Sequence, residues 1–363
     1  MFKEIKELPR GARDVIGSEC EKINFVINKF NNYFDGFAYE EVITPSFEFK
    51  DIFNSVSEEE LYKFYDCEGR MLSLKADSTL AIARLVSSKL KDKKLPLRIR
   101  YSSKVFRVNK NLSGKKNEVF DAGIEIIGEN KENSDIEAIV LGIAVLKNIG
   151  FDDFKIEIGH IGIMQKIISM LNLDANKEKK FIELIDGKKL VDLNYFIESL
   201  DIASDMSDSL KELPWLFGDI DKITGSTIAK NKELKDYIDY LKLINDKLTS
   251  LGFAKYLSFD LGVASKIDYY SGIVFKAYIN GASNDILQGG RYDNLMNSYG
   301  RELGAIGFSL RVDDIAGLIC EKSLPSKKAL KLSYNDENYF EILKDAIKLR
   351  ESGEEVSLVK EEI

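Results

Sequence analysis

Two long segments with β-type alternation, joined by a short polar turn, constrain the fold of this chain more than any other feature. Apolar and polar residues alternate over 95–107 and again over 118–127. The run 109–117 between them is polar and rich in lysine and asparagine, as is typical of a turn. We therefore predict a long antiparallel hairpin at the centre of an α+β fold.

An amphipathic helix is predicted near the amino terminus. Ser18 and Glu21 have the spacing of a capping box, in which each side chain satisfies a free backbone N–H group. Apolar residues follow at helical spacing, and Gly36 stands where a left-handed cap commonly ends a helix. Residues 37–44 are rich in β-forming residues and stop at Pro45, which suits the end of an edge strand.

The rest of the chain predicts a core of strands and helices with an inserted helical region. We expect helices over 78–90 and 312–321, a helix from a capping box at Ser134 and Glu137 to Gly150, and strands over 255–261, 272–279 and 304–310. Residues 174–247 have a charged, helical pattern with little β signal. We expect a core domain over 1–320 with this insertion, and a tail over 325–363 that forms one βαβ unit.

Composition excludes several classes of function. The 363 residues include 52 basic and 60 acidic side chains, a net charge of −8, so a generally basic surface for nucleic acid is missing. A single histidine argues against catalytic triads and removes multi-histidine metal sites, and three scattered cysteines give neither disulfides nor zinc ligands. No apolar run reaches the length of a membrane span. We expect a cytoplasmic protein without membrane contact, metal or cofactor.

A group of polar residues on the predicted strands is the main candidate for chemistry. Asp121 and Glu125 are four residues apart in one strand, and period-two alternation places them on the same face. Arg107 closes the preceding strand, and Tyr269 and Tyr270 precede another. Two carboxylates on one face favour a cation nearby. The pattern fits a structural ion-pair network, and it also fits a pocket for a cationic amino acid.

Two further features have both structural and functional interpretations. Gly289 and Gly290 would let a ligand or a strand approach the backbone closely, with Arg291 and Tyr292 as anchors, but a tight turn is the simpler explanation. His160, the only histidine, is interpreted as a structural imidazole rather than a catalyst.

Seven motifs, taken in order, resemble the class II catalytic core of histidyl-tRNA synthetase. The motifs are RGARD (10–14), GFAYEEVITPSFE (36–48), LKADST (74–79), FR (106–107), AGIEIIG (122–128), DYYSGIVF (268–275) and GGRYDNL (289–295). The resemblance implies an antiparallel sheet of six to seven strands flanked by helices, and a homodimer built around the strand ending at Pro45.

The same resemblance implies a histidine pocket. Asp77 and Thr79 would address the α-amino group of the ligand, and Asp121 stands where the family has a glutamine. Glu125 and Tyr270 would engage the imidazole. The remaining expected ligand-binding residues are Arg107, Tyr269, Arg291 and Tyr292.

Departures from the synthetase pattern remove the residues that handle nucleotide. The family arginine before Asp-Tyr-Tyr aligns with Ser265, and the arginine of the third class II motif aligns with Asp313 and Asp314. After Phe106-Arg107 the usual acid and arginine are also missing. Adenylyl transfer needs fixed positive charge at the α-phosphate, so we expect no aminoacylation and no catalytic residues.

The tail gives an independent argument. The synthetase carries an anticodon-binding domain of about a hundred residues, whereas only residues 325–363 follow the core here. By these features the chain is identified as a member of the regulatory-subunit family of ATP phosphoribosyltransferase, a synthetase paralogue without tRNA. That resemblance implies the short-form catalytic subunit as partner, a role in the first step of histidine biosynthesis, and feedback control by histidine.

Two enzymatic alternatives remain open. One is a divergent or truncated histidyl-tRNA synthetase. The other is an amide-forming or aminoacyl-transfer enzyme on the same scaffold, which would still require the replaced arginines.

Overall fold

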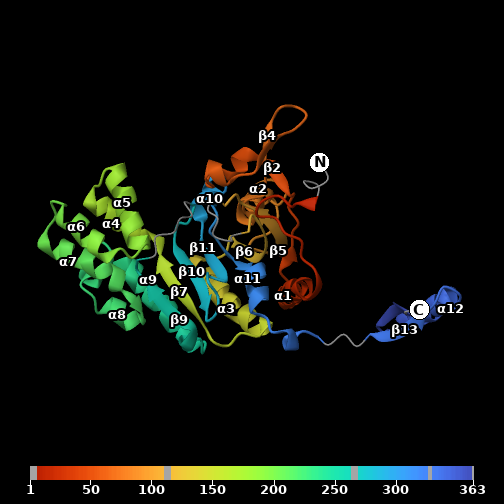
Figure 1. Cartoon of the computed structure of the whole chain (residues 1–363). Helices are drawn as coiled ribbons and strands as arrows, with labels where there is room; N and C mark the ends of the chain where they lie inside the picture. The colour runs from red at the N-terminus through yellow and green to blue at the C-terminus, as the bar shows by residue number, and fades with distance from the viewer. Residues whose placement is uncertain (1–5, 110–115, 263–268, 326–328, 362–363) are drawn as a thin grey trace. The chain divides into compact units, whose positions relative to one another are not determined.

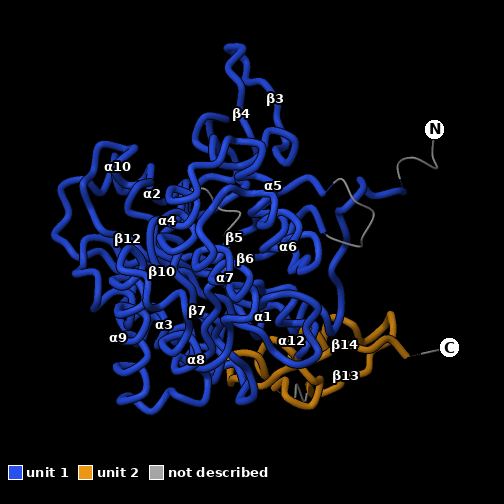
Figure 2. The backbone as a smooth tube through the Cα atoms, turned by 90° about the vertical axis from the view of Figure 1, so that its left-hand side faces the viewer, with its two compact units in different colours: residues 1–318 blue, residues 319–363 orange. Residues whose placement is uncertain are grey.

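The computed structural model describes residues 6–109, 116–262, 269–325 and 329–361. The chain divides into two compact units, Met1–Leu318 and Ile319–Ile363 (Figures 1 and 2). The larger unit contains the sheet, the helices packed on it and the helical region; the smaller unit is a single βαβ element. None of the helices in the described ranges is both long and apolar enough to cross a membrane.

A nine-stranded mixed sheet organises the larger unit. Its central strands are antiparallel, while β1 pairs with β5, and β7 with β9, in parallel. The order is β1 (Glu40–Glu41), β5 (Leu97–Phe106), β6 (Glu118–Ile127), β12 (Ala305–Arg311), β11 (Leu287–Arg291), β10 (Ile273–Ile279), β7 (Phe154–His160), β9 (Leu257–Asp260) and β8 (Phe217–Gly218). The predicted antiparallel core is confirmed, and the sheet is wider than expected.

The predicted hairpin is confirmed as β5 and β6. The two strands pair over their full length, from Leu97 opposite Ile127 to Phe106 opposite Glu118. The tip of the turn, residues 110–115, lies outside the described residues. Because β6 also pairs with β12, the hairpin is joined to the carboxyl-terminal half of the unit.

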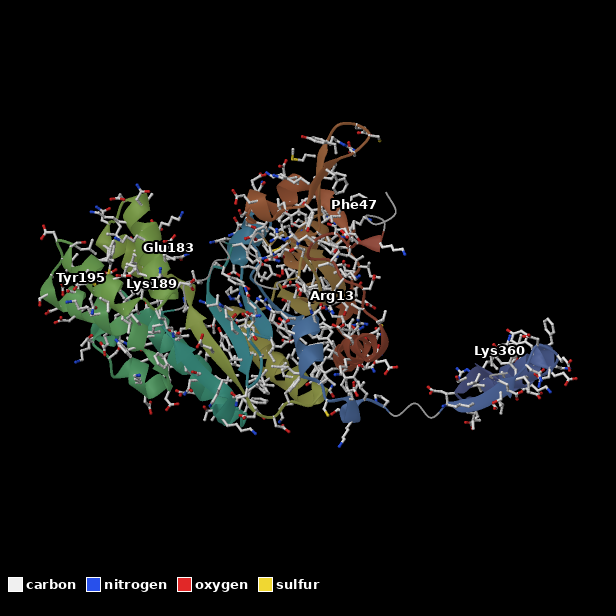
Figure 3. All side chains as sticks on the ribbon, in the orientation of Figure 1. Arg13, Phe47, Glu183, Lys189, Tyr195 and Lys360 are labelled. Atoms are coloured by element: carbon white, nitrogen blue, oxygen red, sulfur yellow. The ribbon has the colours of Figure 1, made fainter. Side chains whose placement is uncertain are left out.

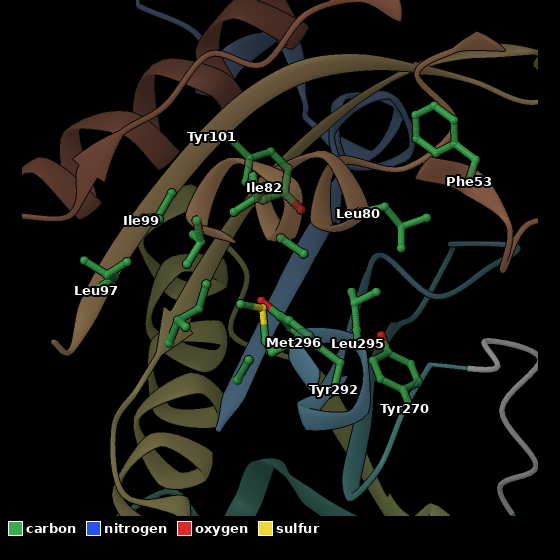
Figure 4. Packing of buried hydrophobic residues seen from close by; sticks show 14 of the residues in the cluster. Phe53, Leu80, Ile82, Leu97, Ile99, Tyr101, Tyr270, Tyr292, Leu295 and Met296 are labelled. Atoms are coloured by element: carbon green, nitrogen blue, oxygen red, sulfur yellow. The ribbon is translucent and has the colours of Figure 1, made fainter. Parts of the chain in front are cut away.

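Helices cover both faces of the sheet. On one face α3 (Lys131–Ile149) packs against β12, α1 (Gly17–Asp35) and α9 (Lys235–Ser250), and α11 (Val312–Leu318) packs against α1 and β6. On the other face α2 (Ser78–Ser88) and α10 (Asp293–Ser298) contribute to an apolar cluster over β5, shown in Figure 4. A small antiparallel sheet, β2 (Phe47–Phe49), β4 (Met71–Leu74) and β3 (Lys63–Tyr65), precedes α2.

The region between β7 and β9 is helical, as its charge pattern indicated. It contains α4 (Ile161–Leu171), α5 (Ala175–Asp186), α6 (Leu190–Glu198), α7 (Ser204–Glu212), α8 (Ile220–Thr224) and α9. Short 3-10 turns lie at Lys50–Phe53, Glu58–Glu60, Leu213–Trp215, Ile228–Lys230, Ala254–Tyr256 and Glu321–Ser323. In Figure 1 the helices α4 to α9, between β7 and β9, occupy the left side of the larger unit.

Three local predictions are wrong. Helix α1 begins at Gly17 after Ile16, without a side-chain cap, and Gly36 is right-handed with φ −64°. Helix α3 begins at Lys131 with Asn130 as its cap, so the Ser134 hydroxyl bonds backbone inside the helix. Gly289 and Gly290 lie within strand β11 instead of forming a tight turn.

The smaller unit is the expected βαβ element. Strands β13 (Leu330–Tyr334) and β14 (Val356–Lys360) are parallel, and α12 (Tyr339–Glu351) connects them. An open groove of about 430 Å³ lies between α12 and β14, lined by apolar residues such as Leu343, Ile347 and Leu358.

A buried ion pair fixes α3 to the sheet. The Arg291 guanidinium donates to the Asp135 carboxylate from Nε at 2.9 Å and from Nη2 at 2.6 Å. Both residues are almost completely buried, and the Tyr240 hydroxyl donates to the second oxygen of Asp135 at 2.6 Å. Breaking such a pair leaves a charge without compensation in the interior.

Replacing Arg291 with methionine is expected to lower the free energy of unfolding by about 3 to 5 kcal/mol, because Asp135 would remain buried without its cation. Urea titration of the full chain measures the effect. The matched control is Asp239→Asn, which removes an exposed ion pair with Lys235 and is expected to change stability by less than about 1 kcal/mol. Equal effects of the two substitutions would contradict the assignment.

Candidate functional site

Glu125 lies at the centre of a buried polar cluster on one face of the sheet. Its two carboxylate oxygens accept hydrogen bonds from the Thr79 hydroxyl at 2.7 Å and from the Tyr292 hydroxyl at 2.6 Å. Glu125 comes from β6, Thr79 from α2 and Tyr292 from the residue after β11. Elements far apart in the sequence therefore converge on one carboxylate.

Asp77 forms a second group beside this carboxylate. Its side chain caps α2 by accepting from the Leu80 N–H group at 3.1 Å, and its other oxygen accepts from Arg107 and from the Tyr269 hydroxyl, each at 3.2 Å. Arg107 also donates to the Ala76 carbonyl at 2.8 Å. The arginine, tyrosine and aspartate predicted from the sequence are thus in direct contact.

Aromatic rings line this cluster. The rings of Tyr269 and Tyr270 lie 5.2 Å apart, and those of Tyr269 and Tyr292 lie 6.1 Å apart, both nearly edge to face. Tyr270 and Tyr292 are buried among apolar residues in Figure 4, as is Tyr101 from β5. Tyr101, which sequence reasoning missed, interacts with Thr79.

Glycines in neighbouring strands make room for these side chains. A Cβ atom at Gly307 would overlap the Glu125 carboxylate, and one at Gly290 would lie 2.8 Å from the Tyr270 ring. Gly307 in β12 was not singled out from the sequence. The signal was its position in an otherwise apolar strand, where glycine often marks a close approach by another group.

Asp121 and Glu125 lie on the same face of β6, as predicted. Asp121 pairs with Ser103 of β5 and Arg311 of β12, while Glu125 pairs with Gly307 of β12. Four residues of strand separate the two acids by about 13 Å. Asp77 influences the pKa of both carboxyl groups.

Burial makes both acids unusually weak. Removal from water raises the pKa of Glu125 to about 8, although hydrogen bonds from Tyr292 and Thr79 act in the opposite direction. Burial also raises the pKa of Asp121 to about 7; Arg107 and Arg311 lower it, and Asp77 and Asp313 raise it. Both carboxyl groups are therefore readily protonated near neutral pH, and a cationic ligand would favour their ionised forms.

Arg291 does not join this cluster. Alternation along β11 places Gly290 on the side of Tyr270, and Arg291 on the opposite side against Asp135 of α3. The prediction of Arg291 as a ligand anchor thus conflicts with its position, and its nearest polar partners are Asp135, Ser134 and Asp293. Its contribution is to hold β11 in place.

His160 has a structural position, as predicted. It is buried and caps α4: its Nδ1 atom accepts from the Gly162 N–H group at 3.0 Å. Burial lowers the pKa of this imidazole to about 4, which agrees with a neutral cap.

Asp313 binds nearby cations through its side chain. Its carboxylate accepts from Arg13, from Lys116 at 3.2 Å and from the Phe120 N–H group at 2.7 Å. Figure 3 labels Arg13 beside helix α11, which carries Asp313. Ser265, another predicted departure from the synthetase, lies outside the described residues. Arg13 and Lys116 are thus both paired with the same carboxylate.

The cluster is chemically suited to hold a small cation between carboxylates and tyrosine rings. Within the described ranges no group of three or more histidine, cysteine or acidic side chains could hold a metal ion.

Comparison with known proteins places the chain in a family. Residues 11–315 match the family model described as histidyl-tRNA synthetase. Proteins called ATP phosphoribosyltransferase regulatory subunit are 38% identical in Clostridium kluyveri, over 96% of this chain and 92% of that protein, and 38% identical in Clostridium novyi, over 87% and 76%.

Solved structures agree with this relationship. A Bacillus halodurans structure titled ATP phosphoribosyltransferase regulatory subunit/histidyl-tRNA synthetase has a TM-score of 0.86 and 28% identity, covering 98% of this chain and 93% of that one. Histidyl-tRNA synthetase from Nostoc has a TM-score of 0.79 at 18% identity, covering 99% of this chain and 86% of that one, which supports the fold alone. The family expected from the sequence motifs is confirmed: the chain belongs to the ATP phosphoribosyltransferase regulatory subunits, within the histidyl-tRNA synthetase fold.

Proposed function

We propose that this chain is the non-catalytic regulatory subunit of an ATP phosphoribosyltransferase. It assembles with the short-form catalytic subunit, supports the first step of histidine biosynthesis and contributes to its feedback control by histidine. The observation that carries this proposal is a site that keeps its acceptors for a cationic ligand while Arg13 and Lys116 are both paired with Asp313. A ligand site whose described positive groups are already paired suits sensing better than the binding of phosphate.

The proposed ligand is histidine. Asp77 and Thr79, together with Asp121, would receive the α-ammonium group, and Glu125 and Tyr270 would receive the imidazole. Arg107 and Tyr269 would fix the Asp77 carboxylate, since both donate to it. Tyr292 would orient Glu125 through its 2.6 Å hydrogen bond.

Assembly follows from the same proposal. A homodimer would form around the segment that contains β1 and ends at Pro45, and the dimers would bind catalytic subunits in the cytoplasm, without tRNA. Coupling requires that histidine bind two assembly states with different affinity.

A second candidate is a divergent histidyl-tRNA synthetase, because the matching family model carries that description. Histidine-dependent exchange of pyrophosphate into ATP separates the two functions. The regulatory proposal expects no exchange above background, whereas robust exchange would establish the synthetase.

Adding the purified chain to a short-form catalytic subunit is expected to raise the rate of ATP phosphoribosylation at least tenfold and to give a larger complex in light scattering. The chain alone should be inactive. A catalytic subunit that works equally well without the chain and forms no complex with it would refute the proposal.

Replacing Glu125 with glutamine is expected to weaken histidine binding about tenfold or more, since a charge-assisted contact would become neutral. Calorimetric titration, with and without the catalytic subunit, measures the affinity. Glu302→Gln, at an exposed position, is the matched control and should leave affinity unchanged. If wild-type chain gives no heat in either setting, the histidine pocket is refuted and only a scaffolding role is left.

Histidine affinity is expected to depend on pH with a plateau between about 7 and 8. Between pH 7 and 8, Glu125 loses a proton when histidine binds, and the imidazole, whose free pKa is about 6.5, gains one. The net number of protons exchanged with water on binding is therefore zero. Below pH 7 Asp121 must also release its proton, so affinity falls with acidity; above pH 8 Glu125 is already ionised, and affinity falls again. Titrations across pH 6 to 9 measure this profile, and Asp121→Asn should reduce the slope between 6 and 7. A monotonic profile in the wild type would contradict it.

A further inference from the structure

Asp121 differs from the other acids of the site in having no direct partner within the described part of the chain. Glu125 accepts two hydrogen bonds and Asp77 accepts three. The Asp121 carboxyl is half-buried, and it feels the charges of Arg107 and Arg311 through space. A carboxyl group in this environment is a ready acceptor for a ligand cation.

The cations near Asp121 are already engaged. Arg107 uses its guanidinium on Asp77 and on the Ala76 carbonyl. Arg311, opposite Asp121 in β12, contacts Asp285 at 3.3 Å. The Lys75 ammonium donates to the Thr44 hydroxyl at 3.3 Å, and burial lowers its pKa. Among the described side chains around the site, each of these positive groups therefore has a partner.

Asp313, at the start of α11, is another charged group near Asp121, and it too is already paired. Its negative charge raises the pKa of Asp121, and its carboxylate contacts Arg13 and Lys116. Among the described side chains, the three carboxyl groups of Asp77, Asp121 and Glu125 lie near two arginines, Arg107 and Arg311, and both arginines are already paired. The cluster attracts amines and imidazolium groups, and it repels a carboxylate.

We propose that Asp121 determines the charge of the ligand: the site binds imidazole-bearing amines that lack a carboxylate more tightly than it binds histidine. The inference rests on the proposed function, because the imidazole is taken from it. A carboxylate beside a half-buried acid loses binding energy to repulsion, and an amino alcohol of the same shape does not. Under this assignment histidine binds weakly, so the site responds only when histidine is abundant.

The test is calorimetric titration of the full chain, alone and with the catalytic subunit, using histidine, histidinol and histamine at pH 7.5. Histidinol keeps the imidazole and the amine and replaces the carboxylate by an alcohol. We expect histidinol to bind at least tenfold more tightly than histidine. Asp121→Asn should weaken histidinol binding far more than histidine binding, because it removes both an acceptor for the amine and the repulsion of the histidine carboxylate, so the ratio falls toward one. Glu302→Gln is the control, and thermal unfolding verifies that each variant is folded.

Each outcome separates the inference from the function on which it rests. If histidine binds as tightly as histidinol or more tightly, the inference is overturned and the histidine pocket stands. If Asp121→Asn leaves the ratio unchanged, Asp121 is not the determinant. If none of the three ligands binds, the pocket itself is refuted, and the inference falls with it.

Discussion

The burial of carboxyl groups on a sheet face without enough cations to neutralise them is the constraint on which this site depends. Glu125 can occupy the interior because Thr79 and Tyr292 donate to it and because Gly307 leaves space. These contacts join α2, β6, β11 and β12 around one side chain. Burial raises the pKa of Glu125 and Asp121, so a cationic ligand that pairs with them would favour their ionised forms.

Two arginines of the larger unit, Arg291 and Arg107, pair with different aspartates. Arg291 lies on the far side of β11, where Asp135 and Ser134 hold it, and so it ties α3 to the sheet. Arg107 lies in the Glu125 cluster, where it donates to Asp77. Because neighbouring residues in a strand point to opposite faces, adjacent polar residues such as Arg291 and Tyr292 serve different tasks.

The sequence predicted the hairpin, the helical region and the shared face of Asp121 and Glu125, because period-two and helical patterns report burial directly. It was wrong about helix starts: the capping box predicted at Ser134 does not form, because Asn130 caps helix α3 instead. Because neighbouring residues of a strand point to opposite faces, assigning Gly289 and Gly290 to a strand would have placed Arg291 on the face away from the site. The hydrogen bond from Arg13 to Asp313 could not be predicted from local patterns, since it joins residues 300 apart in sequence.

Asp313 holds three separate segments of the chain together. It fastens the amino-terminal segment through Arg13, the foot of the hairpin through Lys116, and the strand through the Phe120 N–H group. An arginine at this one position would set three positive side chains against one another and break all three contacts. A single substitution here would therefore disturb the amino-terminal segment, the hairpin and strand β6 together, so a change of charge at residue 313 would require compensating changes at Arg13 and Lys116.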